Sequence, residues 1–134
     1  MHKIKLTVAS AALGLWTYSA GAVTVSPTDA IGQVGHAAKV CGVVASAVYE
    51  ANSRAHPTFV TLVSPNRPSA TRALTAVIYG TDRAKFGGAP EAMLQDQRIC
   101  VTGVVSFFRQ RPEMILNNPA QVSYVSPQSL AELR

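Results

Sequence analysis

Arginine and aromatic side chains recur together in this chain, and such a combination can bind single-stranded nucleic acid. Cations follow the phosphates of a single strand, while aromatic rings stack on its bases. Our candidate nucleic-acid-binding residues fall in predicted loops and strands of one face: Tyr49, Arg54, His56, Phe59, Thr61, Arg67, Arg72, Tyr79, Arg109 and Arg111. Each also has a structural interpretation, because turn arginines are often only solvated and strand aromatics often belong to a core.

The side chains that could catalyse a reaction are scattered. Acid–base cleavage of a glycoside needs two carboxylates at one site. The seven acids fall instead in separate predicted caps, loops and helices: Asp29, Glu50, Asp82, Glu91, Asp96, Glu113 and Glu132. Glu113 follows Arg111 closely and could pair with it. Neither a Gly-x-Ser-x-Gly elbow nor a P-loop is present. We therefore expect a binding protein that is not an enzyme and needs no cofactor.

Histidines and cysteines do not have the spacing of metal ligands. His36 and His56 are the only histidines beyond the N-terminal segment, and the chain has no Cys-x-x-Cys or His-Glu-x-x-His motif. We expect no metal site.

The two cysteines are better explained as a disulfide. Cys41 and Cys100 each lie in a β-branched apolar segment that is typical of a strand. A cysteine pair in an exported chain usually forms a structural cross-link. The prediction is a disulfide that joins two strands.

The N-terminus has the features of a secretory signal peptide. Lys3 and Lys5 precede a short apolar run, and Ala20-Gly21-Ala22 resembles a cleavage site. The alternative is a first helix of the mature fold. We expect residues 1–22 to be the signal and 23–134 to be one domain, exported to the periplasm or the medium. No later apolar run is long enough to span a membrane.

Charge and length set further limits. The chain has 134 residues and a formal net charge of +5, and loss of the two signal-peptide lysines lowers that charge by two. Arginine, which suits planar contacts to phosphates and stacks on rings, supplies most of the remaining cations. The composition predicts a globular, mildly basic domain.

Hydrophobic patterning predicts five strands, at residues 39–47, 58–63, 74–79, 98–108 and 113–117. Short helices are expected at residues 26–34, where Ser26 can act as the N-cap, at 81–86 and 90–94, and at 126–133. In the second strand, alternation favours Val60 and Leu62 facing inward, while Phe59 remains open between core and surface. One of Phe107 and Phe108 must face the core, because neighbours on a strand point oppositely.

The order of these elements predicts the fold. Five strands with a helix between the third and fourth match a five-stranded OB-fold, an all-β Greek-key barrel. In such a barrel the first and fourth strands are neighbours, and Cys41 and Cys100 lie in those two strands. The topology and the disulfide therefore support each other.

The chain also resembles known families. Residues 26–30, 40–47, 57–59 and 99–103 resemble small exported bacterial OB-fold proteins of the nucleic-acid-binding type, some of which are fused to a nuclease module that is absent here. The glycine-containing first strand, followed by Phe59-Val60-Thr61-Leu62, is similar to anticodon-binding OB domains of aminoacyl-tRNA synthetases. The resemblance implies the OB-fold and a nucleic-acid ligand, and its motifs are mainly structural.

A second function fits the same fold. OB-folds use the face of their second and third strands, with the adjoining loops, for oligonucleotides or oligosaccharides. An exported OB-fold could therefore bind single-stranded nucleic acid or, alternatively, an envelope or secreted protein or glycan.

Overall fold

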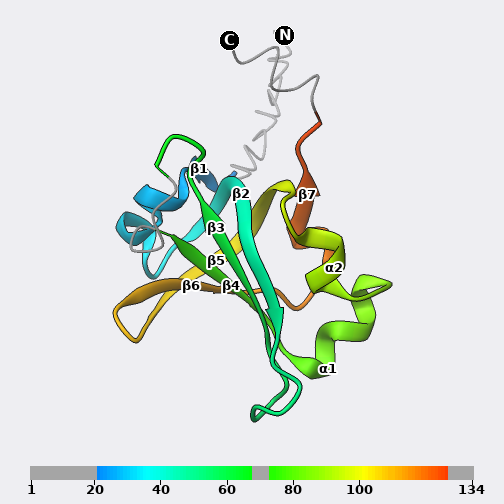
Figure 1. The fold of residues 1–134 in the computed structure, drawn as a ribbon. Helices are drawn as coiled ribbons and strands as arrows, with labels where there is room; N and C mark the ends of the chain where they lie inside the picture. Colours follow the sequence, from blue (N-terminus) through cyan, green and yellow to red (C-terminus); the bar gives the residue numbers. More distant parts are fainter. Residues whose placement is uncertain (1–20, 68–72, 127–134) are drawn as a thin grey trace, which may run out of the picture.

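A computed structural model describes residues 21–67 and 73–126 of the chain (Figure 1). The strands are β1 (Val23–Val25), β2 (Ala37–Tyr49), β3 (Thr58–Val63), β4 (Leu74–Ile78), β5 (Arg98–Phe108), β6 (Arg111–Ile115) and β7 (Val122–Tyr124). The helical segments are η1 (Pro27–Gln33), α1 (Gly80–Arg83), η3 (Ala84–Phe86), α2 (Pro90–Leu94) and η4 (Pro119–Gln121). The predicted helix at residues 126–133 lies almost wholly outside the described residues.

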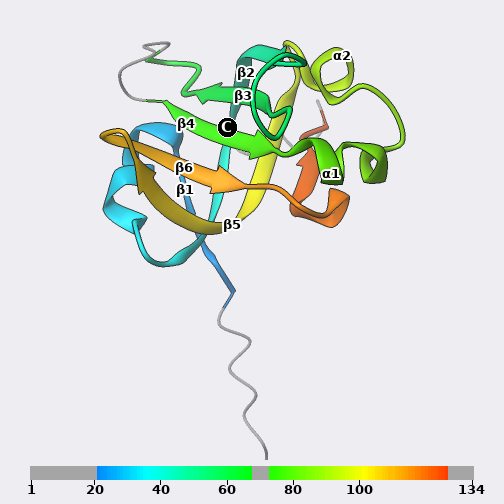
Figure 2. The same ribbon diagram turned by 90° about the horizontal axis from the view of Figure 1, so that it is seen from below.

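Five of the strands close into a barrel. Antiparallel pairs join β2 to β3, β3 to β4, β6 to β5, and β5 back to β2, and a parallel pair joins β4 to β6 (Figure 2). The helices α1, η3 and α2 fall between the third and fourth barrel strands. The predicted OB-fold is confirmed, including the position of its helix.

The two long strands close the barrel because each pairs with different neighbours along its length. The first half of β2 pairs with β5 and its second half pairs with β3. The register with β3 shifts between Val44 and Ser46, which bends the strand at a bulge. Gly42 lies next to this bend, where a Cβ atom would come within 2.7 Å of the Val63 carbonyl oxygen. This close approach requires glycine.

The inner face of the barrel is filled by aliphatic side chains. The largest that are fully buried alternate along the barrel strands with outward-facing residues: Val40, Val44, Val60, Leu62, Leu74, Ile78, Ile99, Val101, Val105 and Met114. Val60 and Leu62 face inward as predicted, since neither is exposed. Burial on this scale is the main stabilising contribution to the fold.

The predicted disulfide is confirmed. Cys41 and Cys100 are direct partners across β2 and β5, with a sulfur–sulfur distance of 2.05 Å and a sequence separation of 59. The bond therefore cross-links the two strands that close the barrel.

Two short strands extend the barrel and were missed by the sequence prediction. β1 runs parallel to the start of β2, and β7 runs antiparallel to β5. Each has three residues, which is too few for a visible alternation of polar and apolar positions. The last barrel strand also begins earlier than predicted, at Arg111 rather than Glu113.

The first helical segment differs from its prediction. Residues Pro27–Gln33 form a 3₁₀ helix, and the Ser26 side chain makes no capping hydrogen bond to the backbone. Its hydroxyl donates instead to the Asp29 carboxylate, at 3.1 Å. Within residues 21–67 and 73–126, the helices are all too short to span a bilayer.

Candidate functional site

The outer face of β3, β4 and β6 carries polar and aromatic side chains at regular positions. Phe59 and Thr61 alternate with the buried Val60 and Leu62, so both point away from the core. Phe59 is 37% exposed. The structure therefore places this ring on the surface rather than in the core.

A row of polar residues crosses this face. Strand pairing aligns Ser46 of β2 with Thr61, Thr61 with Thr75 of β4, and Thr75 with Glu113 of β6. Ser106 of β5 completes the row opposite Glu113. These five residues form the polar row.

An apolar row runs beside it. Val48 pairs with Phe59, Phe59 with Val77, and Val77 with Ile115. Val77 is almost fully buried, whereas the other three side chains are exposed at 37–48%. A flat apolar strip beside polar groups suits stacking of a planar ring.

A cleft of about 490 Å³ lies over the polar row. Its lining consists of Phe59, Thr61, Thr75, Phe108, Arg109, Arg111 and Glu113. Four of these are predicted site residues, namely Phe59, Thr61, Arg109 and Arg111. The structure thus brings together one aromatic, one hydroxyl and two cations from β3 and the β5–β6 hairpin.

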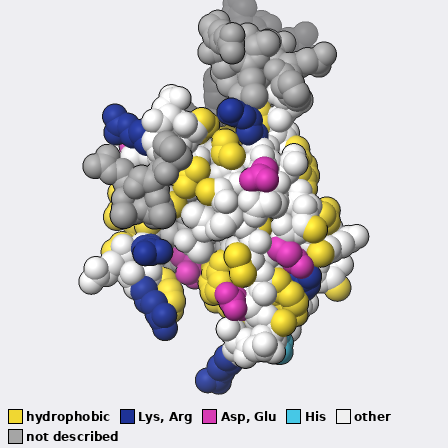
Figure 3. Space-filling model, in the orientation of Figure 1, with side chains coloured by type: hydrophobic (Ala, Val, Ile, Leu, Met, Phe, Trp, Pro, Cys, Tyr) yellow, Lys and Arg dark blue, Asp and Glu magenta, His cyan; other side chains and the backbone are white. Residues whose placement is uncertain are grey.

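The hairpin that borders the cleft turns on two residues. Arg109 and Gln110 both have positive φ, 49° and 66°, as a type I′ turn requires. The Arg109 guanidinium lies over the Phe108 ring, 5.3 Å from its centroid. Figure 3 shows two adjacent basic groups, with hydrophobic surface beside them, at the lower left where this hairpin projects.

The prediction that Phe107 or Phe108 faces the core is wrong. Both rings are more than half exposed. The hairpin projects beyond the barrel (Figure 1), and Val105 is the last residue of β5 that contributes to the core. Phe108 is consequently free to line the cleft.

Glu113 lines the cleft, and its carboxylate has no partner among the described residues. Among the described residues, its carboxylate forms no ion pair, and only its backbone carbonyl accepts a hydrogen bond, from Ser106. The expected Arg111–Glu113 pair is therefore not formed. Burial raises the pKa of the Glu113 carboxyl above its ordinary value.

Tyr49 belongs to a different cluster. The Arg83 guanidinium covers its ring at 3.7 Å from the centroid. Arg83 also binds both carboxylate oxygens of Glu91, at 2.5 and 2.7 Å, and donates to the hydroxyl of the buried Thr58. Because Thr58 and Phe59 point to opposite faces, Tyr49 beside Thr58 is not brought to the cleft.

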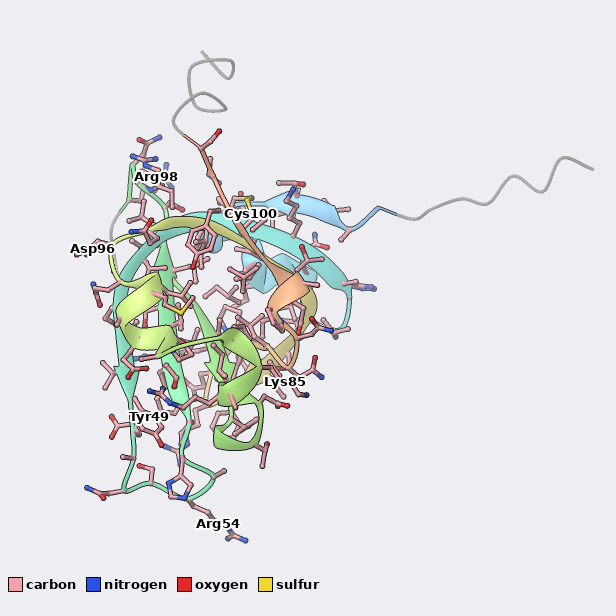
Figure 4. All side chains as sticks on the ribbon, turned by 90° about the vertical axis from the view of Figure 1, so that its right-hand side faces the viewer. Tyr49, Arg54, Lys85, Asp96, Arg98 and Cys100 are labelled. Carbon is pink, nitrogen blue, oxygen red and sulfur yellow. A yellow bond between two sulfur atoms is a disulfide. The ribbon has the colours of Figure 1, made fainter. Side chains whose placement is uncertain are left out.

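The loop between β2 and β3 holds two further candidates outside the cleft. Arg54 is exposed at the loop end (Figure 4). The Nδ1 atom of His56 is 2.6 Å from the Ala51 carbonyl oxygen, and this contact orders the loop. Neither residue lines the cleft.

The remaining candidates are dispersed. Arg67 is exposed in the loop after β3. Tyr79 is half-buried at the N-cap of α1. Arg72 lies outside the described residues. Within the part of the chain that the structure describes, no group of three His, Cys, Asp or Glu side chains could hold a metal ion.

Three lining residues were not predicted as site residues: Thr75, Phe108 and Glu113. Thr75 and Glu113 meet through the parallel pairing of β4 and β6, which no local pattern reveals. Phe108 could have been found from its position next to the turn.

Comparison with known proteins establishes the fold. No protein-family model and no curated protein matches the chain. The crystal structure of yeast Stn1 and Ten1 is similar, with a TM-score of 0.58 and 10% identity over 85% of this chain and 68% of that one. A proposed aspartyl-tRNA synthetase from Leishmania major has a TM-score of 0.50 and 11% identity, over 85% of this chain and 22% of that one. At these identities the likeness shows a shared OB-fold.

Proposed function

We propose that this protein is a non-catalytic module that binds single-stranded nucleic acid in the cleft over the polar row. The observation that carries the proposal is the grouping of Phe59 and Phe108 with Arg109 and Arg111 around one cleft. Exposed rings and cations on the OB-fold's usual binding face match what a single strand requires.

The two arginines are available for phosphates. Neither forms an ion pair within the described part of the chain. Guanidinium groups bind phosphate with two parallel hydrogen bonds. We expect the phosphates to follow the β5–β6 hairpin while the bases lie across the polar and apolar rows.

The fold likeness supports this proposal only in general terms. One similar structure is by its name a tRNA synthetase, and this chain corresponds to 22% of it. Because one fold serves many functions, the residues of the cleft carry the proposal.

We propose in addition that the protein is exported. The pattern of residues 1–22 supports a signal peptide. The Cys41–Cys100 disulfide is compatible with an oxidising compartment. Mass spectrometry of the mature protein tests this, with Val23 expected as the first residue.

The test of nucleic-acid binding is fluorescence anisotropy with a labelled nine-residue oligothymidylate at several salt concentrations. We expect the double variant Arg109→Ala/Arg111→Ala to bind about tenfold or more weakly at low salt. The slope of log affinity against log salt concentration should become less steep by about 1.4, because each lost phosphate contact removes about 0.7.

The matched control is Lys39→Ala/Arg98→Ala. It removes the same charge from the start of β2 and from the start of β5, and neither residue lines the cleft. A loss of affinity that is equal in the two double variants would indicate non-specific charge attraction. Absence of binding at low salt would remove the proposal.

A protein partner is the second candidate, and the exposed apolar row favours it. Val48, Phe59 and Ile115 present exposed aliphatic and aromatic surface of the kind that the core of a protein interface buries. Pull-down from an envelope extract with and without nuclease separates the two functions. A partner that is retained after nuclease treatment, and lost on Ile115→Ser, would support this second candidate.

A further inference from the structure

A negative side chain lies on the floor of a cleft whose rim is positive. Glu113 sits between Thr75 and Ser106 in the polar row. Arg109 and Arg111 line the same cleft from the hairpin. The floor and the rim therefore differ in charge, and a bound strand must meet both.

The carboxylate repels phosphate and attracts hydrogen-bond donors. A phosphate on the floor would place two anions together in a partly desolvated site, which is unfavourable. A nucleobase edge with N–H groups would instead satisfy the carboxylate oxygens, which have no partner among the residues that the structure describes.

We propose that Glu113 reads a guanine base placed edge-on to the floor of the cleft, an inference that rests on the proposed binding of single strands. Guanine has adjacent N1–H and N2–H donors on its Watson–Crick edge, which match the two oxygens of one carboxylate. Cytosine and adenine offer one amine to the same group. Thymine and uracil offer only a ring N–H.

The neighbouring side chains suit the rest of the base. The Thr75 hydroxyl is directly beside Glu113 in the polar row, and Thr61 is next along it. A hydroxyl can donate to the guanine O6 acceptor. Phe59 and Phe108 lie on the two sides of the row and can hold the ring by stacking.

The experiment compares three labelled oligonucleotides in the wild-type protein: nine thymidylates, the same strand with one central guanine, and the same strand with inosine there. We expect the guanine strand to bind about fivefold or more tightly than the all-thymine strand. Inosine lacks the N2 amine, so its affinity should be intermediate.

Glu113→Gln tests the residue that we propose reads the base. The amide keeps the size of the side chain but loses its charge. The guanine preference, which is the affinity for the guanine strand divided by that for the all-thymine strand, should therefore fall to near one. Affinity for oligothymidylate should be retained or increased. Glu50→Gln, with the same change in the exposed β2–β3 loop, should keep the preference. Thermal melting confirms that both variants fold.

The outcomes separate this inference from the proposed function. Binding of all three strands with equal affinity would overturn the reading of guanine but leave single-strand binding intact. A guanine preference that persists in Glu113→Gln would also overturn it. If none of the three strands binds, the proposed function itself fails.

Discussion

Arg83 shows how one side chain can tie the helices to the barrel. Its guanidinium joins Glu91 of α2 to the hydroxyl of Thr58 in β3 and covers the ring of Tyr49. About a quarter of each ion-pair side chain is exposed. Because the contact with Glu91 is bidentate, it should contribute more than an ordinary surface pair.

We predict that Glu91→Gln lowers the free energy of unfolding by about 1 kcal/mol at neutral pH. Urea denaturation measures the change. Asp82→Asn breaks the more exposed pair with Lys85 and should lower it by less than about 0.5 kcal/mol. Equal effects would show that the Arg83 cluster has no special role.

The same pair predicts a dependence of stability on pH. The hydrogen bonds from Arg83 lower the pKa of Glu91 below its ordinary value. A carboxyl whose pKa is lowered in the folded state stabilises the fold at pH values above its unfolded-state pKa. This contribution is lost as the pH falls through the folded-state pKa. The free energies of unfolding of the wild type and of Glu91→Gln should therefore converge as the pH falls below the ordinary range of glutamate pKa values.

At the scale of elements, the β5–β6 hairpin combines an unfavourable turn with residues that line the proposed binding cleft. Arg109 and Gln110 both adopt the left-handed region, which costs a non-glycine residue about 1 kcal/mol. Gln110 does not line the cleft. The turn and the proposed ligand contact can therefore be changed independently.

We predict that Gln110→Gly stabilises the protein by about 1 kcal/mol and leaves oligonucleotide affinity within about twofold. Thermal denaturation and anisotropy measure the two effects. Gln110→Ala is the control, because alanine keeps the strain and should give no such gain. Destabilisation by Gln110→Gly would contradict the turn assignment.

The sequence predicted strand positions correctly where the strands are long and have one buried face. β3 and β5 have the predicted bounds, because Val60, Leu62, Ile99 and Val101 alternate with outward residues. The cysteine pair then indicated which strands are neighbours. The three-residue strands β1 and β7 lack such a pattern.

The candidate site was predictable only in part. Thr61, Arg109 and Arg111 were found because they lie on the face and hairpin that the fold uses. Glu113 was predicted only as a possible partner of Arg111, because its neighbour across the sheet, Thr75, is far away in sequence. Their meeting depends on the parallel register of β4 and β6.

At the scale of the whole molecule, the disulfide closes the chain between the first and fourth barrel strands. It encloses a loop with a sequence separation of 59 residues. A cross-link of this span restricts the unfolded chain far more than the folded one, which already holds the two strands in register.

We predict that Cys41→Ala/Cys100→Ala lowers the free energy of unfolding by about 4 kcal/mol without moving the binding cleft. Denaturant titration of the wild type, with and without reductant, is the parallel measurement. Oligonucleotide affinity of the folded double variant should stay within about twofold of the wild type. A stability change below about 1 kcal/mol would contradict this role.

The split pairing of β2 also governs when the barrel can form during synthesis. β2 is among the first strands to leave the ribosome, yet the partner of its first half, β5, follows only after β3, β4 and the intervening helices. Ring closure must therefore wait until most of the polypeptide has been translated. Until β5 and β6 have been made, β2, β3 and β4 can form only an open antiparallel sheet whose edge strands are unpaired.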